Sequence, residues 1–239
     1  MYIFFLSLYA NCKQKKNEMK KTILFMAIIA ILTSCSLGKK EYTCSISIQI
    51  PATLINQKMV LQEIQNGGFY ASDTILLQKN SFTFDLKLRD TLAIRKAYIV
   101  DFSQLEPIEV ALQQGFVGIS IDNNYQSKVS GNHYNDLIQK NHDEDQKFST
   151  MILALRAEYS EKESKGKLSA QEIKEYPIQL KELIDKNIDR KIAFIKENID
   201  NPVGEYFFHK IYFLLAYEKK QEMMQFATDS IKVAYNYKR

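Results

Sequence analysis

Residues 82–88 read FTFDLKL, and this segment decides the fold of the N-terminal half of the chain. Apolar side chains occupy every second position, and the residues between them are polar or charged. Successive side chains of a strand point to opposite faces, so this alternation predicts a β-strand with one buried and one solvated face. The side chains expected inside are those of Phe82, Phe84, Leu86 and Leu88.

The same period of two recurs between Glu41 and about Ser130. Further candidate strands are residues 42–50, 58–64, 74–78, 97–102, 108–112, 116–121 and 127–130. Turn-forming segments such as Asn66-Gly67-Gly68 separate them, since Gly and Asn tolerate positive φ. Short strands at this spacing, without helix-length insertions, predict an antiparallel β-sandwich or barrel-like domain over residues 42–131.

After Gly131 the apolar period changes to three and four residues, which is typical of amphipathic helices. Asn132 is the expected N-cap of a first long helix, and Gly166 is expected to end it. Ser169 and Glu172 have the spacing of a capping box and predict the start of a second long helix. We expect Pro177 to kink this helix or delay its start. Two such helices with a short connection predict an antiparallel hairpin.

Two more helices are expected beyond the hairpin. A more apolar one follows residues 198–202, with Asp200 as its candidate N-cap close to Pro202, and includes residues 206–215. A last helix is expected over residues 218–235. The predicted fold class is therefore α+β, with the β-rich domain followed by a helical region over residues 132–239.

The N-terminal segment has the pattern of a secretory leader. Lys20-Lys21 precede an apolar run at residues 23–32, which is too short for a permanent membrane-spanning helix. The sequence Leu32-Thr33-Ser34-Cys35 resembles a bacterial lipobox, which implies a lipid on Cys35. We expect a leader at residues 1–34, translated from Met19 rather than Met1, and a short tether at residues 35–41.

The leader accounts for the net charge of +4. Residues 1–34 contain five lysines and one glutamate, and removing them from 32 basic and 28 acidic residues leaves 27 of each. A neutral chain has no bulk attraction for phosphate backbones, so no nucleic-acid partner is expected.

The three cysteines have separate interpretations. Cys12 lies in the segment before Met19, and Cys35 is the expected lipid site. Cys44 lies on the same alternating face as Ile46 and Ile48, which indicates a small buried hydrophobic residue; a reactive thiol or an intermolecular disulfide is the alternative.

The order of these segments resembles a family of extracytoplasmic lipoproteins. In that family a β-rich domain of unknown function precedes a thioredoxin-like thiol–disulfide oxidoreductase domain of the TlpA/ResA type. The segments that carry the resemblance include Ile48-Gln49-Ile50-Pro51, residues 79–84, Leu112-Gln113-Gln114-Gly115, Val129-Ser130-Gly131 and Asn201-Pro202-Val203-Gly204. The thioredoxin-like domain needs a Trp-Cys-x-x-Cys type pair, whereas this sequence has no Trp and no Cys after Cys44. The resemblance therefore implies no catalytic residue and no redox cofactor.

Other candidate sites favour structural interpretations. The cluster His142-Asp143-Glu144-Asp145 lacks the i, i+4 spacing of metal ligands, so a solvated helix face is expected and no metal is assigned. His133 and His209 are isolated in sequence, and we expect partly buried structural roles for both. The 14 tyrosines and 14 phenylalanines are expected mainly to fill a core, although they could line a binding surface.

The functional hypothesis is a lipid-anchored envelope protein with a non-enzymatic binding or scaffolding role. Its expected contacts are the membrane, through Cys35, and a protein partner in the envelope. An accessory or truncated relative of a thiol–disulfide oxidoreductase is the alternative, and capture of a small ligand in the β-domain is a third hypothesis. Ser36 after Cys35 is similar to lipoproteins sent to the outer membrane, so we expect attachment there, facing the periplasm.

Overall fold

The computed structural model describes residues 41–65 and 68–236, and these residues belong to one unit. The predicted leader, the expected start at Met19, the lipid site Cys35 and nearly all of the tether lie outside the described residues. Within the described part, no helix is long and apolar enough to span a membrane.

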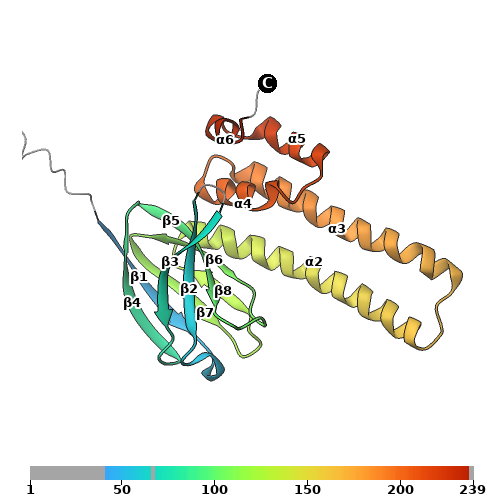
Figure 1. Ribbon diagram of the computed structural model, residues 1–239, viewed down its shortest axis with the longest axis horizontal. Helices are drawn as coiled ribbons and strands as arrows, with labels where there is room; N and C mark the ends of the chain where they lie inside the picture. The colour runs from blue at the N-terminus through green and yellow to red at the C-terminus, as the bar shows by residue number, and fades with distance from the viewer. Residues whose placement is uncertain (1–40, 66–67, 237–239) are drawn as a thin grey trace, which may run out of the picture. The chain divides into compact units, whose positions relative to one another are not determined.

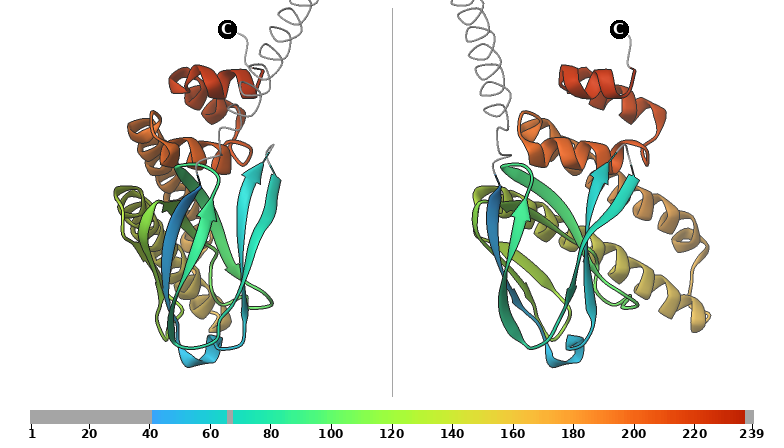
Figure 2. Two further views of the ribbon diagram at one scale, coloured as in Figure 1. Left: turned by 90° about the vertical axis from the view of Figure 1, so that its left-hand side faces the viewer. Right: turned by 60° about the vertical axis from the view of Figure 1, so that its left-hand side comes forward.

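The β-domain consists of two four-stranded sheets (Figures 1 and 2). One sheet has the strand order β4-β1-β7-β8 and the other has the order β3-β2-β5-β6. The strands are β1 (Tyr42–Gln49), β2 (Lys58–Gln65), β3 (Gly68–Leu76), β4 (Ser81–Leu88), β5 (Leu92–Ile99), β6 (Ile108–Gln113), β7 (Gly115–Ile121) and β8 (Ser127–Ser130). A short 3-10 helix, η1 (Ala52–Leu54), follows β1.

The alternation along β4 and β1 has the predicted effect on burial. The apolar residues of β4 face inward, and Leu88 is buried. In β1, Cys44, Ile46 and Ile48 are fully buried, which confirms the shared face expected for Cys44. Burial raises the pKa of the Cys44 thiol, which disfavours the reactive thiolate.

The expected all-antiparallel pairing is correct for one sheet and wrong for the other. β1 pairs with β4 in antiparallel orientation, but it pairs with β7 in parallel, with Cys44 opposite Gly115. Between β1 and β7 the chain forms β2–β3 and β5–β6 of the second sheet, with β4 of the first sheet between these two pairs. The parallel pair is therefore connected without a crossover helix.

Two strands begin well before their predicted first residues. β3 begins at Gly68 rather than at residue 74, and β5 covers residues 92–99 rather than 97–102. In β5 the charged pair Arg95-Lys96 interrupts the apolar pattern, and this hides the first half of the strand.

The two long helices, α2 (His133–Ser164) and α3 (Ala170–Asn198), form the predicted antiparallel hairpin (Figure 1). The Asn132 side chain caps α2 by accepting a hydrogen bond from the Asn135 amide. Ser169 and Glu172 form the predicted capping box, and Gly166 lies in the left-handed region between the helices, with φ of 62°. Gly166 and the capping box both lie within a few residues of the helix ends that they mark. The sequence alone could therefore locate the connection between α2 and α3.

The first turns of α2 cover two open sheet edges. The buried Asn135 accepts a hydrogen bond from the Ala111 amide of β6, 2.8 Å away, and donates to the Ala111 carbonyl. It also donates to the Ser130 carbonyl of β8, 3.3 Å away. Because β6 and β8 are the edges of different sheets, one amide side chain ties both sheets to the helical region.

Three details of the helical region differ from the expectations. α3 starts seven residues before Pro177 and continues through it, so the expected delay is wrong, whereas the alternative of a kink at Pro177 stays a prediction. α4 (Pro202–Tyr212) is capped by Asn201 rather than Asp200, and it ends before residues 213–215. The last segment forms two short helices, α5 (Tyr217–Phe226) and α6 (Asp229–Ala234), which Ala227 and Thr228 separate in extended or capping conformations.

Candidate functional site

A groove of about 980 Å³ lies where β5 meets the C-terminal helices. One wall comes from the β4–β5 turn and from β5. The other wall comes from α4, the residue after it and the end of α6. The residues that matter most for its chemistry are Glu63, Arg89, Arg95, Tyr206, His209 and Tyr235. Its volume lies at the upper end of the range of roughly 300–1,000 Å³ found for small-molecule sites.

Two opposite charges point inward at this end of the sandwich. Arg95 shares its strand face with the buried Ala97 and Ile99, and Glu63 shares its face with Met59 and Leu61. The Arg95 Nη1 atom lies 2.5 Å from the Glu63 carboxylate. Burial lowers the pKa of Arg95, whereas Glu63 opposes that shift, so the guanidinium stays charged inside the wall of the groove.

Tyr206 supplies a buried hydroxyl to the same groove. Its side chain comes from the first half of α4, and the residue is 7% exposed. The hydroxyl has no hydrogen-bond partner among the described residues, and the same is true of the Arg95 Nε atom. Burial, with a further contribution from Glu109, raises the pKa of Tyr206, so this group is a neutral donor. An unpaired buried hydroxyl is costly, which makes Tyr206 the strongest indication of a binding site here.

His209 and Tyr235 form a fixed pair at the helical wall. The His209 Nδ1 atom lies 2.8 Å from the Tyr235 hydroxyl, and the two rings stack at 5.5 Å. The Nε2 atom is 3.7 Å from the Glu205 carboxylate one turn earlier. Burial, followed by the influence of Tyr212, raises the pKa of Tyr235 to about 12. His209 was expected to be isolated and structural; it is half-buried, but it joins Glu205 and Tyr235 in the groove.

The groove therefore combines apolar walls with a few placed polar groups. Leu92, Ile94 and Phe213 provide apolar surface. The Tyr206 hydroxyl and the Arg95 Nε–H are donors without partners in the described part of the chain. A bound molecule with an apolar body and an oxygen acceptor would satisfy both kinds of surface.

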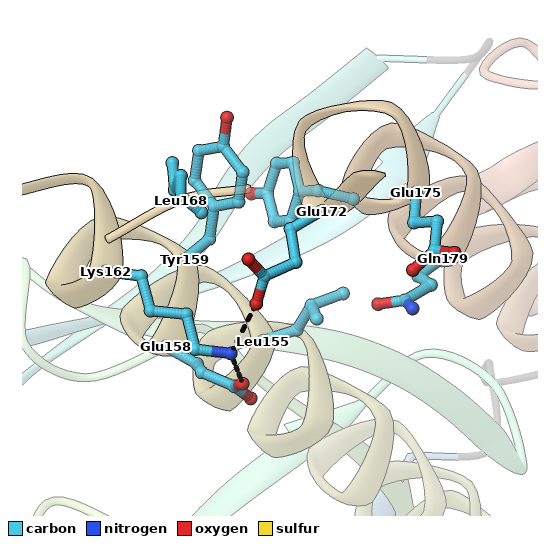
Figure 3. Close-up of a pocket in the computed structure, with 9 residues that line it drawn as sticks. Leu155, Glu158, Tyr159, Lys162, Leu168, Glu172, Glu175 and Gln179 are labelled. Carbon is cyan, nitrogen blue, oxygen red and sulfur yellow. Dashed lines mark hydrogen bonds and ion pairs between the residues drawn. The ribbon is translucent and has the colours of Figure 1, made fainter. Parts of the chain in front are cut away.

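A second hollow, of about 220 Å³, lies between α2 and α3 near the hairpin connection (Figure 3). Lys162 bridges Glu158 and Glu172 across it, at 2.7 and 2.9 Å. Hydrogen bonds from the Ser169 backbone and side chain, and then from Lys162, lower the pKa of Glu172 to about 2. Tyr159 and Tyr176 stack at 4.0 Å beside these groups. Lys162, Glu158 and Glu172 are already paired with one another, so this hollow is a weaker candidate than the groove.

The acidic end of the cluster at residues 142–145 has a structural role. Asp145 accepts hydrogen bonds from Asn187 and Lys191 of α3, at 2.8 and 2.9 Å, and Arg190 lies 3.4 Å away. Burial alone would raise the pKa of Asp145, but the hydrogen bonds from Lys191 and Asn187 lower it overall. No group of three or more His, Cys, Asp or Glu side chains arranged for a metal ion occurs in the part of the chain that the structure describes.

Asp145→Asn is expected to lower the free energy of unfolding by about 1–2 kcal/mol at pH 7, because Lys191 and Arg190 lose their counter-charge. Folding lowers the Asp145 pKa, so its contribution is present above the unfolded value of about 4 and is lost as pH falls. Urea unfolding should therefore show a difference between wild type and variant at pH 7 that shrinks at pH 3. Asp185→Asn, which removes a surface pair with Lys181, should change stability by less than about 0.5 kcal/mol. An undiminished difference at pH 3 would contradict the electrostatic explanation.

Arg95 and Tyr206 were not singled out from the sequence. The predicted strand began at residue 97, so Arg95 fell outside it and its inward position was hidden. A strand drawn from residue 92 would have placed a charge on the core face, which is a signal of a functional or paired residue. Tyr206 offers no such signal, since an aromatic residue on the apolar face of a helix normally fills a core.

No family model matches the chain, and comparison with the curated proteins and with the solved structures likewise gave no match. The function of the groove is therefore inferred from its own residues alone.

Proposed function

We propose that this protein is a non-enzymatic binding protein of the bacterial envelope, held at the outer membrane by a lipid on Cys35. In this proposal the groove between β5 and α4–α6 receives the ligand. The anchor is supported by the sequence around Cys35, and the groove by its volume and lining. The observation that carries the binding role is the buried Tyr206 hydroxyl, which has no partner among the described residues.

The ligand class follows from the lining. The walls carry Arg89 and Arg95 together with Glu63, Asp90 and Glu205, so the groove has no strong net charge. A multiply charged ligand is therefore disfavoured. An apolar or aromatic molecule with one carboxylate or carbonyl group fits better, because its oxygen can accept hydrogen bonds from Tyr206 or Arg95 while its body packs on Leu92, Ile94 and Phe213.

Binding fits the groove better than turnover. The His209 ring, a potential general base, is already engaged by Tyr235 through Nδ1 and lies near Glu205 through Nε2. The Tyr206 pKa is raised, which disfavours the phenolate that a nucleophile or base would need. These groups can donate hydrogen bonds to a ligand and hold it in position, which is what a binding site requires.

Tyr206→Phe tests the proposal with two opposite effects. In the free protein it should raise the free energy of unfolding by about 1 kcal/mol, because an unpaired buried hydroxyl is removed. It should weaken binding of N-acetylphenylalanine, used as an amphipathic carboxylate probe, by about tenfold, because the ligand loses one hydrogen bond. Thermal unfolding with and without the probe measures both effects.

Tyr217→Phe is the matched control, since Tyr217 is 70% exposed. It should leave both stability and probe binding unchanged. Loss of stability in Tyr206→Phe would show that the hydroxyl has a partner within the protein. Equal binding of the probe by wild type and Tyr206→Phe would contradict the assignment of the groove as the ligand-binding site.

A further inference from the structure

Several strongly exposed apolar side chains lie at, or within a few residues of, the positions of the C-terminal helices that line the groove. Phe213 and Leu214, just after α4, are 65% and 82% exposed, and Val233 of α6 is 76% exposed. Tyr217, at the start of α5, lies three residues after Leu214. The Phe213 ring is 5.4 Å from Tyr235, two residues beyond Val233, so the ends of α4 and α6 meet here. We call Phe213, Leu214, Tyr217 and Val233 the apolar patch.

The chain enters the folded unit at the same end of the sheets. Tyr42, the first residue of β1, pairs with Leu88, and Lys87 binds Glu41 at 2.6 Å. The next residues of the chain, Arg89 and Asp90, line the groove together with Phe213. The groove therefore spans the region between the entry point and the apolar patch. Figure 2 shows that β1 begins at the end of the sheets nearest to α4–α6.

The length of the tether limits how far this end can lie from a lipid on Cys35. Five residues lie between Cys35 and Glu41. The six steps along the chain, at no more than about 3.5 Å each, reach about 20 Å at most. If Cys35 is lipidated, as the proposed function requires, the entry point stays within that distance of the membrane surface. The groove, with Phe213 in its lining, lies at the end of the unit where the tether joins it.

The composition of α4–α6 indicates how such a contact would form. Over residues 202–236 the basic residues are Lys210, Lys219, Lys220 and Lys232, and the acidic residues are Glu205, Glu218, Glu222 and Asp229. The segment is neutral, so attraction to anionic headgroups contributes little. Exposed Phe, Leu and Tyr side chains instead favour the interface between headgroups and acyl chains.

We propose that the apolar patch inserts into the lipid surface as a second contact beside the lipid on Cys35, and that it holds the groove against the membrane. A single weak apolar contact gives marginal binding, whereas two linked contacts reinforce one another. Ligands would then reach the groove from the membrane side. This inference rests on the proposed lipid anchor.

The absence of tryptophan from the sequence provides a clean test. Leu214→Trp places the only tryptophan of the chain in the apolar patch, and Leu153→Trp places it on α2, where Leu153 is 64% exposed. Each lipidated full-length protein is reconstituted into vesicles of dioleoylphosphatidylcholine or of its dibrominated analogue. Bromine quenches tryptophan on contact, so emission from position 214 should fall at least about twofold, and emission from position 153 should hardly change.

Flotation of the same vesicles separates failure of the anchor from failure of the patch. One outcome is that wild type floats with the vesicles, Cys35→Ser floats poorly, and the tryptophan at position 214 is not quenched. This outcome would support the lipid anchor on Cys35 and contradict the membrane contact of the apolar patch. Blue-shifted but unquenched emission from the Leu214→Trp variant would show that protein, such as a second copy, covers the patch. Equal quenching at positions 153 and 214 would contradict the proposed orientation, in which the apolar patch faces the lipid and α2 does not. If wild type and Cys35→Ser float alike, the anchor fails, and the inference fails with it.

Discussion

Replacing Gly204 by alanine is expected to lower the free energy of unfolding by about 3 kcal/mol or more. An added Cβ atom would lie 2.0 Å from the Asn198 carbonyl oxygen and 2.3 Å from its carbon. These are backbone atoms at the end of α3, so no side chain can rotate away. α4 would have to move off α3, and Tyr206, two residues later, would move with it.

Gly166→Ala is the matched control for this substitution. Gly166 has φ of 62°, and no atom lies within 4 Å of an added Cβ. Its cost is therefore conformational only, about 1–2 kcal/mol. Thermal unfolding should place Gly204→Ala several degrees below Gly166→Ala, and probe binding in the groove should weaken only in Gly204→Ala. Equal melting temperatures would show that α3 and α4 can separate at little cost.

The features that sequence could predict are those specified locally. Alternation along residues 82–88 predicted β4, and the capping box at Ser169 predicted the start of α3. Both signals act within a few residues of the structure they specify. Asp200 was the predicted cap of α4, but Asn201 caps it. Both residue types form good N-caps, so the local pattern does not distinguish them.

The features that sequence missed depend on distant partners. Arg95 is tolerated on an inward position of β5 because Glu63 of the neighbouring strand β2 pairs with it. The parallel pairing of β1 and β7 and the bridge from Asp145 to α3 also join residues far apart in the chain. The groove depends on the same kind of juxtaposition, since its walls come from β5 and from helices more than 100 residues later. A local pattern does not show which of these residues will meet.

Phe208→Ala is expected to lower the free energy of unfolding by about 3–5 kcal/mol, because Phe208 is fully buried and large. Its ring stacks on Tyr212 at 5.4 Å and meets Tyr235 edge to face at 6.0 Å, so it joins α4 to the end of α6. Removing it leaves a cavity beneath the wall that presents His209 and Tyr235 to the groove. Both stability and probe binding should fall.

Phe213→Ala, five residues further on, is the informative comparison. Phe213 is largely exposed, so its loss should change unfolding in solution by less than about 0.5 kcal/mol. If the apolar patch contacts lipid, however, adding the same substitution to Leu214→Trp should reduce the quenching of that tryptophan in brominated vesicles. Phe208 would then hold the groove together from within the fold, and Phe213, which lines the groove, would hold it against a membrane. A stability loss in Phe213→Ala comparable to that in Phe208→Ala would contradict this division, since it would mean that Phe213 is packed within the fold.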